Sequence, residues 1–419
     1  MRISKALAGL LIFSSASAFA QAIPSLIPVL WTQDLRYFAK EIETKHRDPY
    51  HLTPKTRFDA EVLALETRIP SMKNYEVVVG LQRLAALVGD GHTFVDTSKL
   101  YHRLPIEAFW FGHDLRVVRA APEYKKAIGA KIVKVGSTPI AEVRSELQQL
   151  IPEGENQWFV MDKTAELITR IEPLAALRII PYSDSASFTF ENDSGGRFTL
   201  QLRAKPLGQS GPLDVLDDRA PLPYRHPDAP FWFTYLSDSQ TVYVDFRSYQ
   251  GLKTEARHLR ELIAQHPVKR LVIDMRSNGG GDYTKGRDYL IYKIIYMRQL
   301  NRAGRLFVIT GRRTFSAAMV NVTDFRRETE AIIVGEPTGA RPNGYQENYW
   351  FTLPSSKLRV SCAMLKYRFE PDSDSVAVFP DHRIDPDWNM LRAGQDAAMN
   401  WILSQPLPDE RRGTTSSAP

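Results

Sequence analysis

Apolar residues in the first hundred positions recur at the spacing of a helix. Leu35, Phe38 and Ile42 lie three and four residues apart, and the same period resumes after a break at Pro49. The segment 75–88 repeats the pattern once more. Because one face of a helix returns every three to four residues, we predict amphipathic helices that each bury one side.

Between about residues 104 and 202 the pattern changes to short runs rich in β-branched and aromatic residues, with glycines and prolines at their ends. Such runs are typical of strands and tight turns. The predicted elements are strands at 106–111, 114–119 and 129–140, a helix at 141–150 and a hairpin at 187–202 that turns at Ser194-Gly195-Gly196.

After residue 240, apolar strands alternate with amphipathic helices. The predicted strands are 241–246, 271–275, 306–310 and 331–334, and the predicted helices are 254–265, 288–300 and 316–327. Such alternation indicates a sheet covered by helices. Strands at 349–353 and 358–363 and a helix at 395–402 complete the prediction, and the fold class is therefore α/β, or α+β across several domains.

These changes in pattern divide the chain into segments, with a proline-rich linker before the alternating part. The predicted divisions are a signal peptide at 1–20, a helical region at 21–99, a β-rich module at 100–205, the linker at 206–232, a core at 233–405 and a disordered tail at 406–419.

The first twenty residues have the features of an export signal. Arg2 and Lys5 precede an apolar centre at 6–13, and Ala18-Phe19-Ala20 supplies small residues around a cleavage position. The apolar centre is too short to span a bilayer. We therefore predict a periplasmic or secreted protein with no stable membrane insertion after the signal is removed.

Composition narrows the possible classes. The apolar fraction of 43% fits a globular protein, and the single cysteine, Cys362, excludes an intramolecular disulfide. The net charge of +6 falls to +4 when Arg2 and Lys5 are removed, and the remaining charges are interspersed. This distribution argues against nucleic-acid binding. The nine histidines lack metal-binding spacings, so we predict neither a metal nor a cofactor.

Ser316 lies where a predicted strand and Gly311 give way to a predicted helix. A serine at a helix start can simply cap an unpaired backbone N–H. Alternatively it can act as a nucleophile, because the Ala317 N–H and the positive end of the helix dipole would stabilise an oxyanion.

A second turn changes the balance between these alternatives. The strand at 271–275 leads into three consecutive glycines at 279–281, where no side chain blocks access to the main chain. The N–H group of Gly279 or Gly280 could be the second oxyanion donor. The turn lacks the spacing of a phosphate-binding or dinucleotide-binding loop, and alone it would also fit an ordinary flexible turn.

Together the two turns belong to an ordered set of motifs at 271–281, 311–318, 333–339, 353–358 and 380–381. This set resembles the tail-specific (C-terminal processing) serine peptidases, a family that includes the tricorn protease core and the repeats of interphotoreceptor retinoid-binding protein. The resemblance implies a ClpP/crotonase-like peptidase core with Ser316 as nucleophile. The run 129–140 is similar to a PDZ-like module, which binds peptide ends by strand addition; a module that binds nothing remains an alternative.

The sequence departs from the bacterial members of the family at the general base. Arg341 occupies the position of their lysine, and an arginine stays protonated and cannot accept the serine proton. The segment 87–93 resembles the one that supplies a histidine in the tricorn branch, which implies that His92 is the base. Imidazole titrates near neutral pH and suits proton transfer. Lys366 is the next candidate if His92 is not the base.

The group that orients His92 is less clearly marked, because Gly91 stands where tricorn-type enzymes have a serine. Asp90 and Thr93 are neighbouring candidates, and Asp372 and Asp374 are more distant ones. We assign the role to Asp374, by resemblance to the C-terminal acid of that branch. His46 and His51 are interpreted as structural.

The function that follows is an exported serine endopeptidase that acts on polypeptides through an acyl-enzyme, with Ser316, His92 and Asp374 in the catalytic roles and Ala317, Gly279 and Gly280 at the oxyanion hole. Two alternatives remain: a non-catalytic protein that binds hydrophobic ligands on the same fold, and a serine esterase. Oligomeric state and cleavage preference do not follow from the sequence.

Overall fold

The computed structural model describes residues 23–205, 213–215 and 221–408. The predicted signal peptide therefore lies outside the described residues, as do most of the predicted tail and part of the predicted linker. Within those three ranges, no helix is both long and apolar enough to cross a bilayer. The predicted domain boundaries stay predictions.

The N-terminal part consists of helices α1 (Pro28–Lys45), α2 (Lys55–Arg68) and α3 (Asn74–Val88), and the predicted helical pattern is confirmed. Leu35, Phe38 and Ile42 are all buried. α3 ends at Gly89, whose φ of 104° is a left-handed conformation that costs glycine little. His92 follows this turn directly.

The middle part is built on an antiparallel sheet. Its main strands are, in spatial order, β2 (Ile106–Phe111), β3 (Asp114–Ala120), β4 (Lys131–Val135), β6 (Ser185–Glu191) and β7 (Arg197–Arg203). Two short strands, β5 (Thr138–Pro139) and β8 (Asp214–Val215), pair with β4 and β3. The predicted strands, the hairpin and helix α4 (Ile140–Gln148) are confirmed.

Two helices of the middle part were not predicted, α5 (Gln157–Leu167) and α6 (Ile171–Ala176). Both are buried on most sides, because they lie between the middle sheet and other parts of the chain. A helix that is covered all round loses the one-sided apolar period by which sequence analysis finds helices. Helix α5 carries three charged side chains, Asp162, Lys163 and Glu166, that line the same cavity as Ser316.

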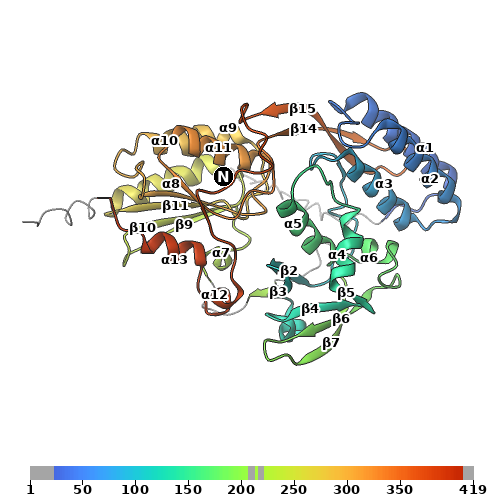
Figure 1. Ribbon diagram of the computed structural model, residues 1–419, viewed down its shortest axis with the longest axis horizontal. Coiled ribbons are helices and arrows are strands. Elements are labelled where there is room, and N and C mark those ends of the chain that lie inside the picture. Colours follow the sequence, from blue (N-terminus) through green and yellow to red (C-terminus); the bar gives the residue numbers. More distant parts are fainter. Residues whose placement is uncertain (1–22, 206–212, 216–220, 409–419) are drawn as a thin grey trace, which may run out of the picture.

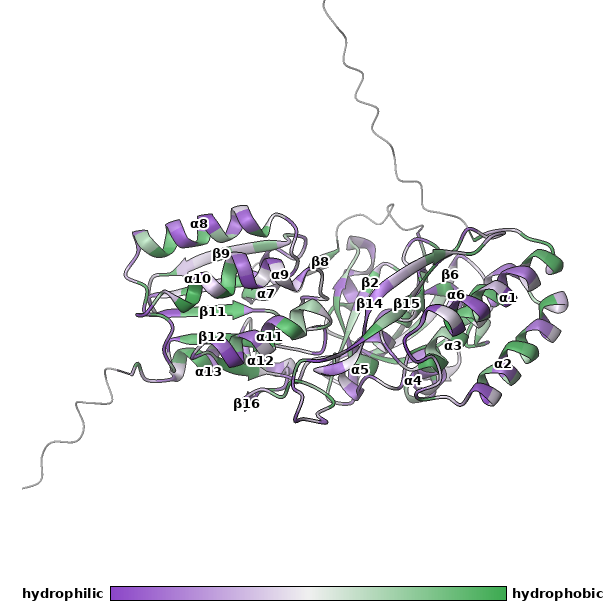
Figure 2. Ribbon diagram, turned by 90° about the horizontal axis from the view of Figure 1, so that it is seen from above, coloured by the Kyte–Doolittle hydropathy of each residue, from purple (hydrophilic) through white to green (hydrophobic). Residues whose placement is uncertain are grey.

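The C-terminal core is a six-stranded sheet. Its spatial order is β16 (His382–Arg383), β13 (Ile332–Gly335), β12 (Leu306–Thr310), β11 (Arg270–Asp274), β10 (Thr241–Phe246) and β9 (Phe231–Leu236). All neighbours are parallel except β9, which is antiparallel to β10. Figure 2 shows apolar β11 and β12 between helical layers, and the predicted α/β alternation is confirmed.

The helices of the core include α8 (Leu252–Gln265), α11 (Ala317–Glu328), α12 (Trp388–Arg392) and α13 (Ala397–Ser404); a short helix, α7 (Leu222–Arg225), precedes β9. The continuous helix predicted at 288–300 is wrong. Residues 283–295 form α9 (Tyr283–Gly286), a π-helical turn at 287–291 and α10 (Tyr292–Ile295), and the helix stops there. An added Cβ at Gly286 would approach Asn321 Oδ1 to 1.9 Å, so this segment packs tightly on α11.

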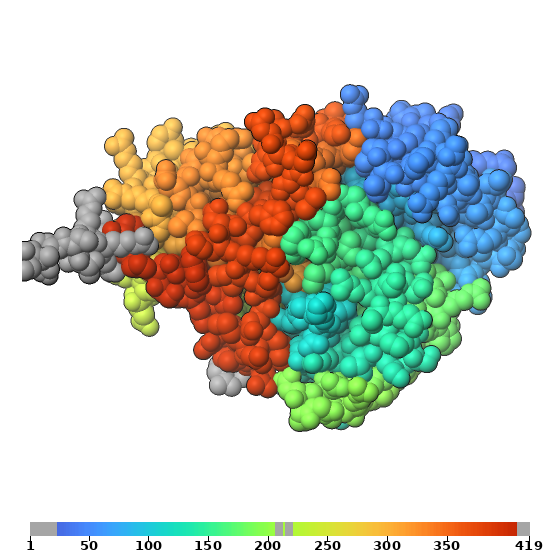
Figure 3. All heavy atoms as spheres, viewed as in Figure 1, coloured from blue at the N-terminus to red at the C-terminus, as the bar shows by residue number. Residues whose placement is uncertain are grey.

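A long hairpin connects the two ends of the molecule. Strands β14 (Asn343–Thr352) and β15 (Arg359–Arg368) extend from the core to α1 (Figure 1), and β15 also pairs with β1 (Phe94–Val95). Both strands are longer than predicted. Their far ends join the hydrophobic core of the N-terminal and middle parts. In Figure 3 these three parts of the chain pack directly against one another.

Candidate active site

Ser316 occupies a strained turn between β12 and α11. Its φ of 52° and ψ of −127° are unusual for any residue other than glycine. The turn is held by Thr314, which donates a hydrogen bond to the Met275 carbonyl at 2.8 Å and accepts one from the Gly311 N–H at 3.0 Å. Strain at a fixed turn of this kind holds a side chain where a relaxed loop would not.

The glycine-rich turn lies against Ser316. The Phe315 N–H donates to the Asn278 carbonyl at 3.1 Å, which joins the two turns. At Gly280, with φ of 108°, an added Cβ would lie 2.7 Å from Ser316 Cβ and 3.2 Å from the Ala317 nitrogen. Only glycine leaves this space open.

The backbone N–H groups of the two turns differ in availability. The Gly280 N–H donates to Asn278 Oδ1 at 3.0 Å and is therefore occupied. Among the described residues, no acceptor is bound to the N–H groups of Gly279 and Ala317. Of the three predicted oxyanion donors, these two are free to serve a ligand.

His92 reaches Ser316 from the other end of the chain. Its Nε2 lies 2.9 Å from Ser316 Oγ, which is a hydrogen-bond distance between residues 224 positions apart. The ring also stacks on Phe315, with centroids 5.0 Å apart. The structure therefore brings together the serine and the histidine that the sequence singled out separately.

The loop before His92 is fixed by Asp90. This carboxylate accepts hydrogen bonds from the His92 N–H, the Thr93 hydroxyl and His46 Nε2, at 2.9–3.0 Å. Asp90 and Thr93 thus hold the backbone of the loop rather than the imidazole. His46 has a structural role, as predicted, although its partner lies 44 residues away and could not be found locally.

Strand β15 holds the segment after His92. Ser361 donates to the His92 carbonyl at 2.8 Å, and the Ala363 N–H donates to Thr93 Oγ1 at 3.2 Å. Phe94 and Val95 continue this contact as the paired strand β1. The hairpin thus fixes the histidine relative to the core.

In the described part of the chain, no third side chain pairs with the second ring nitrogen of His92, although the Tyr345 backbone carbonyl and the charge of Glu347 lie near enough to the ring to raise its pKa. Nδ1 is buried and has no hydrogen-bond partner among the described residues. Asp374 and Asp372 are exposed in the loop after β15, and the structure does not bring either of them to the ring. Lys366 is also exposed, with its ammonium 4.9 Å from the centre of the Tyr345 ring.

Burial is the main influence on the imidazole. It lowers the pKa of His92 from its usual value, although the negative charge of Asp90 opposes the shift. A lowered pKa keeps the ring neutral at pH 7, and a neutral ring with its proton on Nδ1 accepts a hydrogen bond from the Ser316 hydroxyl at Nε2.

Glu155 is a site residue that the sequence analysis missed. Its Oε1 accepts a hydrogen bond from the Gly91 N–H at 2.8 Å, and its Oε2 is buried without a partner among the described residues. Burial raises the pKa of Glu155 to about 7. Arg341, in the place of the family's lysine, donates to the Glu155 carbonyl at 3.1 Å. The only sequence signal was an acid in the turn 153–156, which resembles any surface loop.

Ser316 and His92 line a cavity of about 910 Å³ between the middle part and the core. Gly279 and Phe315 also face it, together with side chains of α5. The volume suits several residues of an extended peptide. Among the described residues, no group of three His, Cys, Asp or Glu side chains could hold a metal ion.

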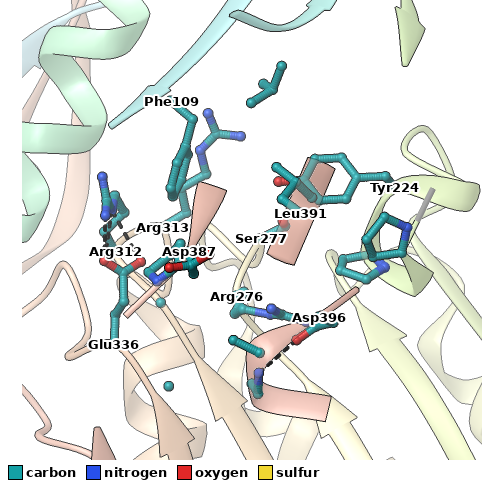
Figure 4. Close-up of a pocket in the computed structure, with 18 of the residues that line it drawn as sticks. Phe109, Tyr224, Arg276, Ser277, Arg312, Arg313, Glu336, Asp387, Leu391 and Asp396 are labelled. Atoms are coloured by element: carbon teal, nitrogen blue, oxygen red, sulfur yellow. Dashed lines mark hydrogen bonds and ion pairs between the residues drawn. The ribbon is translucent and has the colours of Figure 1, made fainter. Parts of the chain in front are cut away.

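A smaller cavity of about 130 Å³ lies beside the first, between Phe109, Tyr224 and the C-terminal helices (Figure 4). Its charged groups satisfy one another: Arg276 pairs with Asp396 at 2.6 Å, and Arg312 donates to Glu336 at 3.1 Å. Ser316 is not among its lining residues. We therefore place the candidate chemistry in the larger cavity.

No family model matches the sequence, and no curated protein matches it. Solved structures do. Mature CPAF complexed with lactacystin is 12% identical, with 90% of this chain and 97% of that chain covered and a TM-score of 0.63. A serine-to-alanine mutant of CPAF is 10% identical, with 94% and 100% covered and a TM-score of 0.64. This chain therefore shares the fold of CPAF.

More distant matches include the photosystem II D1 C-terminal processing protease, at 17% identity with 90% and 99% of the two chains covered and a TM-score of 0.41. The tricorn protease is 12% identical, with 89% of this chain and 36% of that chain covered and a TM-score of 0.39. These two likenesses are weaker than the one to CPAF, and the fold assignment rests on CPAF alone.

Proposed function

We propose that this protein is a serine peptidase in which Ser316 is the nucleophile and His92 the general base. The observation that carries the proposal is the 2.9 Å contact between Ser316 Oγ and His92 Nε2 inside a cavity. A strained turn and a buried histidine both cost stability, and neither is needed for a sheet covered by helices. Catalysis accounts for both.

In the first step Ser316 Oγ attacks the carbonyl carbon of a peptide bond while His92 Nε2 takes the hydroxyl proton. The carbonyl electron pair moves onto oxygen, where the N–H groups of Ala317 and Gly279 stabilise the negative charge. When the intermediate collapses, the C–N bond breaks and His92 donates the proton to the leaving amine. Water then repeats the sequence on the acyl-enzyme and releases Ser316.

Because no third side chain of the described residues pairs with the ring, the proposed arrangement is a dyad in which the Tyr345 backbone carbonyl is the nearest support for the imidazole. The fixed backbone around His92 replaces part of what a third group does, because Asp90, Glu155 and Ser361 hold the segments on both sides of the ring. Asp374 would have to move to contribute. The proposed mechanism therefore gives Asp374 no catalytic role.

Export to the periplasm or outside the cell remains part of the proposal, because residues 1–20 have the composition of a cleavable signal. The antiparallel sheet of the middle part, with β2 at its edge, supports a peptide-binding role of the PDZ type.

The test is labelling with a fluorophosphonate, which reacts with activated serines. We expect stoichiometric labelling of the mature protein at Ser316, identified by mass spectrometry, and none in Ser316→Ala. Ser404→Ala, at an exposed serine of α13, is the matched control and should label normally. Absence of labelling in the wild type, with uptake of an apolar ligand, would favour the non-catalytic alternative.

Matched peptide and ester substrates then separate the two hydrolytic alternatives. A peptidase should cleave an unactivated internal peptide bond and lose that activity in Ser316→Ala. Hydrolysis of esters alone would support the esterase.

A further inference from the structure

The residues of the middle part that line the large cavity, together with Arg313 of the core, carry more positive than negative charge. The cationic side chains there are Arg103, Arg119, Lys163, Arg170 and Arg313, and the carboxylates are Glu107, Asp162 and Glu166. Five cations thus share three anions. An excess of this kind at a catalytic cavity needs an explanation, because charges inside proteins are normally paired.

The carboxylates are already committed. Arg313 takes Asp162 at 2.6 Å and one oxygen of Glu107 at 3.2 Å. Lys163 takes one oxygen of Glu166 at 3.2 Å. For carboxylate partners, Arg119 and Arg170 have only the longer contacts that are left, and Arg119 Nη2 also donates to the Leu213 carbonyl at 3.3 Å.

Those remaining contacts are 3.3 Å from Arg119 to Glu107 and 3.4 Å from Arg170 to Glu166. Arg119 Nε and Arg170 Nη1 are buried without a hydrogen-bond partner among the described residues. The side chain of Arg103 has no hydrogen bond or ion pair within the described part of the chain, and its Nε is also buried.

The backbone places two of these guanidinium groups side by side. Arg103 and Arg170 are direct partners in an antiparallel bridge, so their side chains leave the backbone on the same face. Like charges directly opposite one another destabilise such a pair. Burial, and then the positive charge of Arg170, lower the pKa of Arg103, and the negative charges of Glu107 and Glu166 oppose this shift only in part, so the charged guanidinium is less stable there than in water.

The arginines of the smaller cavity provide a comparison, because each of them is paired with a carboxylate. There the arginines Arg276 and Arg312 each have a carboxylate within hydrogen-bond distance (Figure 4). An arginine-rich wall in this protein is therefore normally neutralised from within. Arg103, in contrast, has no carboxylate within hydrogen-bond distance among the described residues, and Arg170 shares its one carboxylate, Glu166, with Lys163.

We propose that Arg103 and Arg170, assisted by Arg119, bind a carboxylate of the peptide substrate, so that the enzyme prefers acidic peptides. This inference rests on the proposed function, because it concerns the same cavity. The guanidinium groups present paired N–H donors that match a carboxylate, and such hydrogen bonds strengthen where water is excluded. A glutamate or aspartate side chain or the C-terminal carboxylate of the substrate can supply the ligand.

Peptide pairs of otherwise identical sequence test the preference. One pair differs by Glu against Gln at a single internal position, scanned along the peptide, and a second pair ends in a free carboxylate or an amide. We expect the carboxylate member of one pair to be cleaved with a kcat/KM about 10- to 100-fold higher, the usual worth of a charged hydrogen bond. The pair that shows the effect identifies the source of the carboxylate.

Arg103→Gln should remove this preference and leave fluorophosphonate labelling of Ser316 unchanged. Arg57→Gln, at an exposed arginine of α2, is the control and should retain the preference. Equal cleavage of both members by the wild type, or a preference that persists in Arg103→Gln, would overturn the proposal. Because the substitution removes a like-charge pair, we also expect its unfolding midpoint to be no lower than that of the wild type.

Binding to Ser316→Ala separates this proposal from the proposed catalysis. Calorimetry with the Glu and Gln peptides, or the acid and amide peptides, measures recognition without turnover. The site is supported, even if labelling fails, when Ser316→Ala binds the carboxylate peptide more tightly than the neutral one. The Arg103→Gln/Ser316→Ala double variant should then bind the two peptides equally. Equal binding of both members contradicts the site even if Ser316 is a nucleophile.

Discussion

The two halves of the candidate active site are built in different ways. Ser316 is held by neighbours in the same core, since β11 and β12 are adjacent strands and the turns that follow them contact each other directly. His92 is held by segments far away in sequence: Glu155 on one side and Ser361 on the other. A site assembled in this way depends on the docking of the N-terminal and middle parts onto the core.

The difference predicts how each half responds to damage. The nucleophile half should fail through local steric change, because its geometry is set by glycines and a strained turn. In the base half, each single substitution should lower activity only in part, because several hydrogen bonds together position the His92 ring. Loss of activity can therefore be compared between substitutions in the two halves.

The largest effect is expected from His92→Ala. Loss of a general base lowers turnover by about 10²–10⁴-fold. Peptide hydrolysis by the purified variant measures it, and His258→Ala, at an exposed position of α8, is the control. Turnover that stays within a factor of two would remove His92 from the mechanism and direct attention to Lys366.

Gly280→Ala should break the nucleophile half. The new Cβ would lie 2.7 Å from Ser316 Cβ, and a displacement of the reacting group by about 1 Å can cost about 10²-fold in rate. Gly195→Ala is the matched control, since Gly195 also has a positive φ but has nothing within 4 Å of an added Cβ. Both variants carry the strain of a positive φ, and Gly280→Ala should lose more stability because its Cβ also meets the Phe315 carbonyl at 3.0 Å. If both retain similar activity, the contact at Ser316 does not matter.

Glu155→Gln should alter the pH dependence of stability. The folded-state pKa of about 7 exceeds the usual glutamate value of 4.5, so the native state binds the extra proton between these pH values. The wild type therefore loses stability as pH rises through this window, by at most about 3 kcal/mol. The glutamine variant does not titrate, and its stability relative to the wild type should improve from pH 4.5 to pH 7.

Urea unfolding at pH 5 and pH 8 measures this change, with Glu153→Gln, an exposed neighbour, as the control. The same difference between Glu155→Gln and the wild type at both pH values would mean that the carboxyl is not buried as a neutral group.

Ser361→Ala should give the smallest effect. It leaves the His92 carbonyl and the Asn348 amide without their hydrogen-bond partner, at a cost of about 1–3 kcal/mol in unfolding free energy. Activity should fall less than in Gly280→Ala, because Asp90 and Glu155 still hold the loop. A larger loss than in Gly280→Ala would show that β15 alone places the histidine.

The sequence predicted the nucleophile half more completely than the base half, for a physical reason. A strand, a glycine-rich turn and a helix start are adjacent in sequence, and their residue types are set by local conformation. The roles of Asp90, Glu155 and Ser361 arise from contacts across 64 or more positions or from backbone bonds that residue type does not reveal. The fold class followed from periodicity, whereas buried helices such as α5 left no periodic signal.

The most direct test of the account is the pH dependence of the rate at which a fluorophosphonate labels Ser316. Because burial lowers the pKa of His92, we predict that the labelling rate stays constant as the pH is lowered past about 6.5, the usual histidine pKa, and decreases only at more acidic pH. His92→Ala should label much more slowly and should not show this decrease at acidic pH. A rate that rises steadily to high pH, with the same profile in the wild type and in His92→Ala, would contradict the central claim that His92 activates Ser316.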